Sequence, residues 1–69
     1  MKKNGKKVFF VEVVYDDEST LSFEAMVEGK PHEYMAVLMM VTRGFLMSSG
    51  GVQATCYNSE GFDVCSYVK

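Results

Sequence analysis

The sequence predicts a single α+β domain in which two hairpins flank one helix, in the order ββαββ. Three observations support this class. Residues 8–28 hold two β-rich segments around a polar turn, the residues from 31 onward carry apolar side chains at helical spacing, and residues 52–68 hold two more β-rich segments. The chain has 69 residues, of which 48% are hydrophobic and 23% charged, as is usual for a folded domain.

The first hairpin is predicted from residues 8–15, which are β-branched and aromatic, and from residues 21–28, which alternate apolar and polar. The polar run 16–19 is a turn signal. A register that sets Val11 opposite Phe23 or Ala25 segregates the apolar side chains, whereas a slip of one residue would set them against polar ones. The segregated face comprises Phe9, Val11, Val13, Tyr15, Leu21, Phe23, Ala25 and Val27. The first strand is then apolar on both faces, which indicates a central strand.

A helix is predicted to follow the break at residues 29–31. Pro31 suits the first helical position because its missing N–H would have no partner there, and the helix dipole favours Glu33 in the first turn. The helix is expected to end between Gly44 and Ser49. Its inner stripe is predicted to be Tyr34, Val37, Leu38, Val41 and Phe45.

The second hairpin is predicted around residues 58–61, where asparagine and glycine suit a type I turn that ends in a left-handed residue. This turn pairs Asn58 with Phe62 and Cys56 with Val64. One face then holds Val52, Ala54, Cys56, Phe62, Val64 and Val68, and the other holds Gln53, Thr55, Tyr57, Asp63, Cys65 and Tyr67. The two cysteines are therefore expected on opposite faces, which disfavours an intrachain disulfide.

The strand order 2-1-3-4 is favoured for an antiparallel sheet with the helix on one face. This order puts the first strand in the centre and allows the right-handed crossover that makes the second and third strands parallel. Other strand orders stay open. Residues 1–7 are expected to form a flexible basic arm, and residues 8–69 the domain.

Two surfaces are expected to be more apolar than a monomer needs. The outer helix face holds Ala36, Met39, Met40 and Met47, and the open sheet face holds Val8, Phe10, Val14, Met26, Tyr57 and Tyr67. Exposed apolar patches usually mark interaction surfaces, and homodimers are the commonest assemblies. We therefore expect a homodimer, through the sheet face or an edge strand first and the helix methionines second; another protein partner is the alternative. The alternative is that the helix is rotated relative to the predicted phase, or that a longer loop covers it, so that the methionines belong to the core.

The sequence holds no pattern that predicts catalysis, a metal or a cofactor. His32 is the one histidine, and nothing in the sequence fixes it near Cys56 or Cys65. The spacing of these residues lacks the paired ligands of structural zinc sites, and no phosphate-binding loop is present. The expected function is therefore a non-catalytic interaction or regulatory module.

Nucleic-acid binding is the alternative function, because basic residues near sheet aromatics can hold single strands. Its candidate contacts are Tyr57, Tyr67, Lys2, Lys3, Lys6 and Lys7. The acidic remainder of the chain and the formal net charge of -2 count against it. A small enzyme or ligand carrier with its site between protomers is a third hypothesis. We expect a cytoplasmic protein with no membrane contact, because there is no signal-like segment, no apolar stretch of about 20 residues and only two cysteines.

Overall fold

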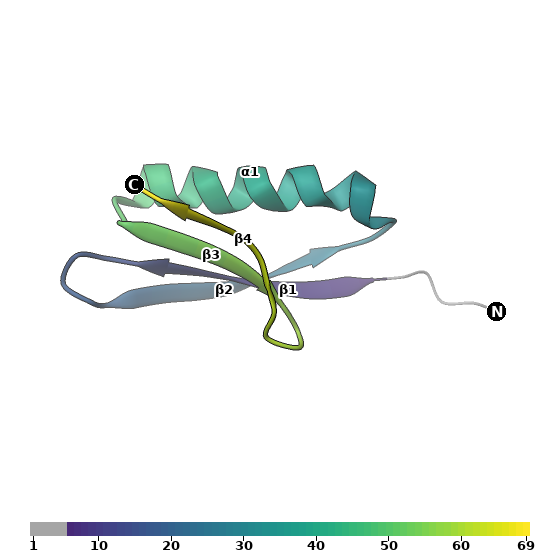
Figure 1. Cartoon of the computed structure of the whole chain (residues 1–69), viewed down its shortest axis with the longest axis horizontal. Coiled ribbons are helices and arrows are strands. Elements are labelled where there is room, and N and C mark those ends of the chain that lie inside the picture. Colours follow the sequence, from purple (N-terminus) through teal and green to yellow (C-terminus); the bar gives the residue numbers. More distant parts are fainter. Residues whose placement is uncertain (1–5) are drawn as a thin grey trace.

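The computed structural model describes residues 6–69, which form a four-stranded sheet with one helix lying along one face (Figure 1). The elements are β1 (Lys7–Val14), β2 (Thr20–Val27), α1 (Pro31–Ser49), β3 (Gln53–Asn58) and β4 (Asp63–Val68). The strand order is β2-β1-β3-β4 and all neighbouring pairs are antiparallel, so β2 and β3 run in the same direction. The predicted α+β class, element order and strand order are confirmed. Most of the predicted basic arm lies outside the described residues, and β1 begins at Lys7.

The first hairpin has the segregated register. Val11 lies opposite Phe23, and Phe9 lies opposite Ala25. Because β1 pairs with β2 on one side and β3 on the other, it is a central strand, as its two apolar faces predict. In the turn, the Asp17 carboxylate accepts hydrogen bonds from the backbone N–H and the hydroxyl of Ser19, and these bonds lower the pKa of Asp17.

The helix begins and ends at local signals that the sequence carries. Pro31 occupies the first turn, and the Glu33 carboxylate accepts a hydrogen bond of 2.9 Å from the Lys30 N–H, one of the donors that a helix start would otherwise leave unpaired. Gly50 ends the helix in the left-handed conformation, with φ of 81°, which costs glycine little.

The face of the helix that meets the sheet differs from the predicted stripe. The buried helix residues are Tyr34, Leu38, Thr42 and Leu46, one every four positions. Val37 and Phe45, which the sequence placed inside, are 50% and 39% exposed. Thr42 is tolerated in the core because its hydroxyl donates a 2.7 Å hydrogen bond to the carbonyl of Leu38, one turn earlier.

The second hairpin contains a bulge that the sequence analysis missed. Asn58 bonds to Phe62 as predicted, but Cys56 lies opposite Cys65, not Val64. The ladder shifts by one residue between Cys56 and Tyr57, so that Val64 is the extra residue on β4. The predicted faces of β4 beyond this point are therefore wrong.

The core lies between α1 and the sheet. Its buried hydrophobic residues are Phe9, Val11, Val13, Tyr34, Leu38, Leu46, Ala54 and Cys56. The helix packs mainly on β3 and β4 and less on β1. The helix side of β2 is consequently the least covered part of this face.

Candidate interaction surfaces

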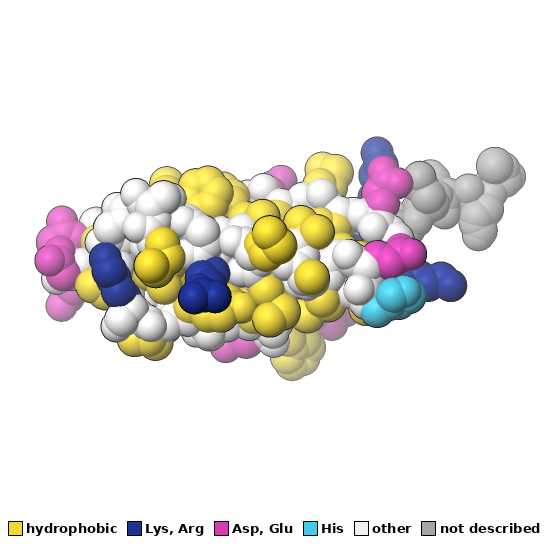
Figure 2. Space-filling view, turned by 90° about the horizontal axis from the view of Figure 1, so that it is seen from above, with side chains coloured by type: hydrophobic (Ala, Val, Ile, Leu, Met, Phe, Trp, Pro, Cys, Tyr) yellow, Lys and Arg dark blue, Asp and Glu magenta, His cyan; other side chains and the backbone are white. Residues whose placement is uncertain are grey.

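The outer face of α1 is apolar and exposed. We call it the methionine face and define it by Ala36, Met39, Met40 and Met47. Met40 and Met47 are 72% and 61% exposed, and Met39 is 43% exposed. Figure 2 shows hydrophobic side chains along the length of the helix, with few charged groups among them. The alternative in which these methionines belong to the core therefore does not hold within the described protomer.

The open sheet face, which lies opposite α1, is less apolar than predicted. Phe10 and Tyr57 are neighbours on β1 and β3 with ring centroids 6.0 Å apart, and both are half-buried. Glu12 and Glu24 share this face with them, because side chains alternate along each strand. Val8, Val14 and Met26 lie at the predicted positions, Met26 largely exposed.

Tyr67 is absent from the open face. The bulge at Val64 sets Tyr67 opposite Ala54, which is fully buried, and both Tyr67 and Cys65 pack against the core. The prediction for Tyr67 is wrong because a single extra residue turns the following side chains of β4 to the other face. Val68, the next residue of β4, lies on the open face instead and is 76% exposed.

A third apolar surface runs along the edge between α1 and β2. We call it the β2 flank and define it by Leu21, Phe23 and Phe45. The rings of Phe23 and Phe45 are 4.5 Å apart, which places this side of the helix over β2. Leu21 and Phe45 are 43% and 39% exposed. The sequence pattern placed these three side chains in the core, because α1 is apolar nearly all round and its periodicity does not fix which side of the helix faces the sheet.

The two cysteines face each other across β3 and β4, which corrects the prediction of opposite faces. Both thiols are free; Cys56 is buried and Cys65 half-buried. The Cys65 Sγ lies 3.9 Å from the Thr42 hydroxyl oxygen, which it can approach as a weak donor. Burial raises the pKa of Cys56, and the nearby Cys65 raises it further. A raised pKa keeps the thiol protonated and weakens it as a nucleophile.

His32 lies far from this thiol pair. It is exposed in the first turn of α1, ten positions before Thr42, a separation of about 15 Å at the helical rise. The imidazole therefore does not reach either thiol as a base. Within residues 6–69, no cluster of histidine, cysteine and carboxylate side chains is arranged to hold a metal ion.

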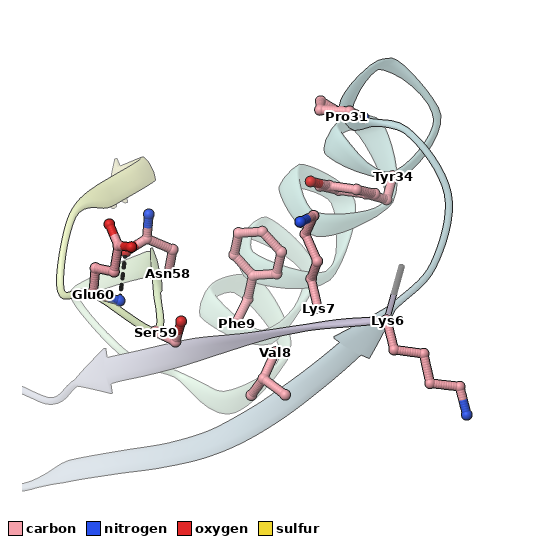
Figure 3. Close-up of a pocket in the computed structure, with 9 residues that line it drawn as sticks. All are labelled: Lys6, Lys7, Val8, Phe9, Pro31, Tyr34, Asn58, Ser59 and Glu60. Atoms are coloured by element: carbon pink, nitrogen blue, oxygen red, sulfur yellow. Dashed lines mark hydrogen bonds between the residues drawn. The ribbon is translucent and has the colours of Figure 1, made fainter. Parts of the chain in front are cut away.

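An open groove of about 670 Å³ lies where the start of β1, the start of α1 and the β3–β4 turn meet (Figure 3). Lys7, Phe9 and Tyr34 point into it from one side, and Asn58 and Glu60 lie on the other. The Asn58 side-chain oxygen already accepts hydrogen bonds from the backbone N–H groups of residues 60 and 62, so it serves the turn. Neither the thiol pair nor His32 lines this groove.

The basic residues that the sequence singled out divide between described and undescribed positions. Lys2 and Lys3 lie outside the described residues. Lys6 is exposed, and its amine lies 3.9 Å from the carboxylate of Glu28, while Lys7 is exposed beside the groove. No helix among residues 6–69 is long and apolar enough to cross a membrane.

Comparison with known proteins assigns no family. The chain matches no protein-family model, no curated protein and no solved structure.

Proposed function

We propose that this protein is a small non-catalytic interaction module that acts as a cytoplasmic homodimer through its exposed apolar surface. One observation carries the proposal: the described protomer leaves ten large hydrophobic side chains at least about two-fifths exposed. They are Leu21, Met26, Val37, Met39, Met40, Phe45, Met47, Val52, Phe62 and Val68.

This exposure is costly for a chain of 69 residues. A domain of this size buries only about 60% of the surface that its unfolded chain exposes, and each large apolar side chain that becomes buried adds about 1.5–3 kcal/mol. Covering the methionine face or the β2 flank with a second copy would recover part of that free energy. Self-association therefore supplies stability that the single protomer lacks.

The chemistry of the described residues supports a non-catalytic role. The thiol with the raised pKa is buried, and the single histidine is about three helical turns away from it. Two free cysteines are also compatible with a reducing compartment, which supports the cytoplasmic assignment.

Light scattering tests the proposal on the untagged full chain. We expect the mass of a dimer at about 100 µM, with dissociation toward the 7.7 kDa protomer as the protein is diluted. A constant protomer mass over this range would refute it.

Binding of single-stranded nucleic acid is a second candidate, favoured by the neighbouring Phe10 and Tyr57 rings on the open sheet face. Aromatic rings on a sheet can stack on bases, but Glu12 and Glu24 on the same face repel phosphates. Fluorescence titration with an oligonucleotide at two salt concentrations tests this function. Binding that weakens with salt and is lost in Tyr57→Ser would support it, and no binding at low salt would exclude it.

A further inference from the structure

We propose that two copies pair through their β2 edges, antiparallel and centred on Phe23, so that two four-stranded sheets join into one. This inference rests on the proposed homodimer and adds the strand, the register and the axis of its interface. Four observations lead to it: the unequal protection of the two sheet edges, the direction of the free backbone groups, the charge pattern of β2, and the exposed β2 flank.

The two edges of the sheet are not equally protected. β4 is six residues long and carries the bulge at Val64, a device that natural sheets use to prevent edge pairing. β2 is eight residues long, pairs with β1 in unbroken register and contains no proline and no lysine. A long regular edge without such devices is a template for another strand.

The backbone groups that β2 offers can be assigned residue by residue. Tyr15 donates its N–H to the carbonyl of Ser19 at 2.9 Å, so these two residues form a hydrogen-bonded pair. Hydrogen-bonded and non-hydrogen-bonded pairs then alternate along the β1–β2 ladder. The residues of β2 that bond to β1 are therefore the odd-numbered ones. The even-numbered residues direct their N–H and C=O groups away from the sheet, and they are Thr20, Ser22, Glu24 and Met26.

The charge pattern of β2 selects one register. In a two-fold antiparallel pair that keeps both helices on one face, the two most extensive registers centre on Phe23 or on Glu24. The second sets two Glu24 carboxylates directly opposite each other, and like charges in that position are destabilising. The first sets Glu24 opposite the partner's Ser22 and Phe23 opposite the partner's Phe23.

The β2 flank is placed to continue the core across this axis. In the Phe23 register, Leu21 lies opposite the partner's Ala25 on the helix side of the joined sheet. Leu21 is 43% exposed in the protomer, and Phe45, which contacts Phe23, is 39% exposed above the same edge. Pairing β2 therefore covers apolar side chains as well as satisfying backbone groups, whereas β4 pairing would leave this flank exposed.

Proline substitution at the two edges gives a matched test. Ser22→Pro removes an N–H of β2 that points away from the sheet. On β4, the hydrogen bond from the Lys69 N–H to the Val52 carbonyl shows that the odd-numbered residues bond to β3, so the N–H of Ser66 points outward and Ser66→Pro removes it. Sedimentation equilibrium should show a dimer dissociation constant raised about 100-fold in Ser22→Pro, since two symmetric bonds are lost and two carbonyls left unpaired. Ser66→Pro should dimerise as the wild type does.

Amide hydrogen exchange on the wild type provides a second measurement that needs no substitution. Raising the protein concentration should slow exchange at Ser22 and Glu24 and leave Ser66 unchanged. A dimer that persists in Ser22→Pro, or one that does not slow exchange at Ser22 and Glu24, would overturn the β2 interface while leaving the homodimer in place. A wild-type protein that stays monomeric would overturn both.

Discussion

The rotation of α1 about its own axis predicts unequal losses of stability when two adjacent side chains are truncated. Leu46 is 2% exposed and Phe45 is 39% exposed, although sequence periodicity placed Phe45 in the inner stripe. We therefore expect Leu46→Ala to destabilise the protein more than Phe45→Ala does, even though phenylalanine is the larger residue.

The magnitudes follow from burial. Truncating a fully buried leucine removes its transfer free energy and leaves a cavity, at a cost of about 3 kcal/mol. Phe45 keeps two-fifths of its surface in water and loses mainly its contact with Phe23, so its truncation should cost about 1–2 kcal/mol. A domain of this length has a total stability of about 3–10 kcal/mol, so the Leu46 variant should lose about a third or more of it.

Urea unfolding followed by circular dichroism measures both variants. The midpoint should fall further for Leu46→Ala than for Phe45→Ala, with slopes equal to that of the wild type. All three proteins should be compared at one concentration low enough for light scattering to give the protomer mass, since Phe45 belongs to the β2 flank. The reverse order of midpoints would mean that Phe45 faces the sheet and that the helix phase described above is wrong.

Three further outcomes are expected. Gly51→Ala should lower the urea midpoint, at a cost of about 1–3 kcal/mol, because a Cβ at this position would overlap the side chain of Val13 in the core. Gly44→Ala is the control: it lies in the helix with open space around it, so the substitution should raise stability by about 0.5–1 kcal/mol. The raised pKa of Cys56 contributes stability that is fully present at neutral pH and is lost as the pH rises past the ordinary thiol range. Unfolding should therefore become easier above about pH 9, and Cys56→Ser should reduce that alkaline loss; an equal loss in both proteins would contradict this origin. Phe10→Asp should leave the dimer dissociation constant within about tenfold of the wild-type value, and a larger loss would move the interface to the open sheet face.

The parts of the fold that could be predicted are those in which apolar side chains segregate in one way only. The register of β1 on β2 is an example, because any slip would set Val11 against polar side chains of β2. The helix phase was not predictable from the same pattern, since α1 is apolar nearly all round and Val37 looks as suited to the core as Leu38.

The bulge at Val64 could not be predicted either, because more than one arrangement of β4 buries apolar side chains. In a regular strand over residues 62–68, either Val64 and Val68 or Cys65 and Tyr67 would face the helix. The bulge lets Val64, Cys65 and Tyr67 all pack against the core and leaves Val68 exposed. The consequences for the candidate site were direct. Tyr67 lies on the helix side of the sheet and not on the open face, and the two cysteines lie opposite each other. The β2 flank is exposed, although the sequence pattern predicted that its side chains belong to the core.

The dependence of thermal stability on protein concentration tests most directly whether a second copy covers the exposed apolar surface. A folded dimer gains stability by mass action, so a hundredfold increase, from about 2 to about 200 µM, should add up to about 1.4 kcal/mol per protomer. For a domain of this size that corresponds to a rise in Tm of several degrees, up to about 10 °C. A Tm that is the same at both concentrations would contradict the account, because the apolar surface of the protomer would then be left in water.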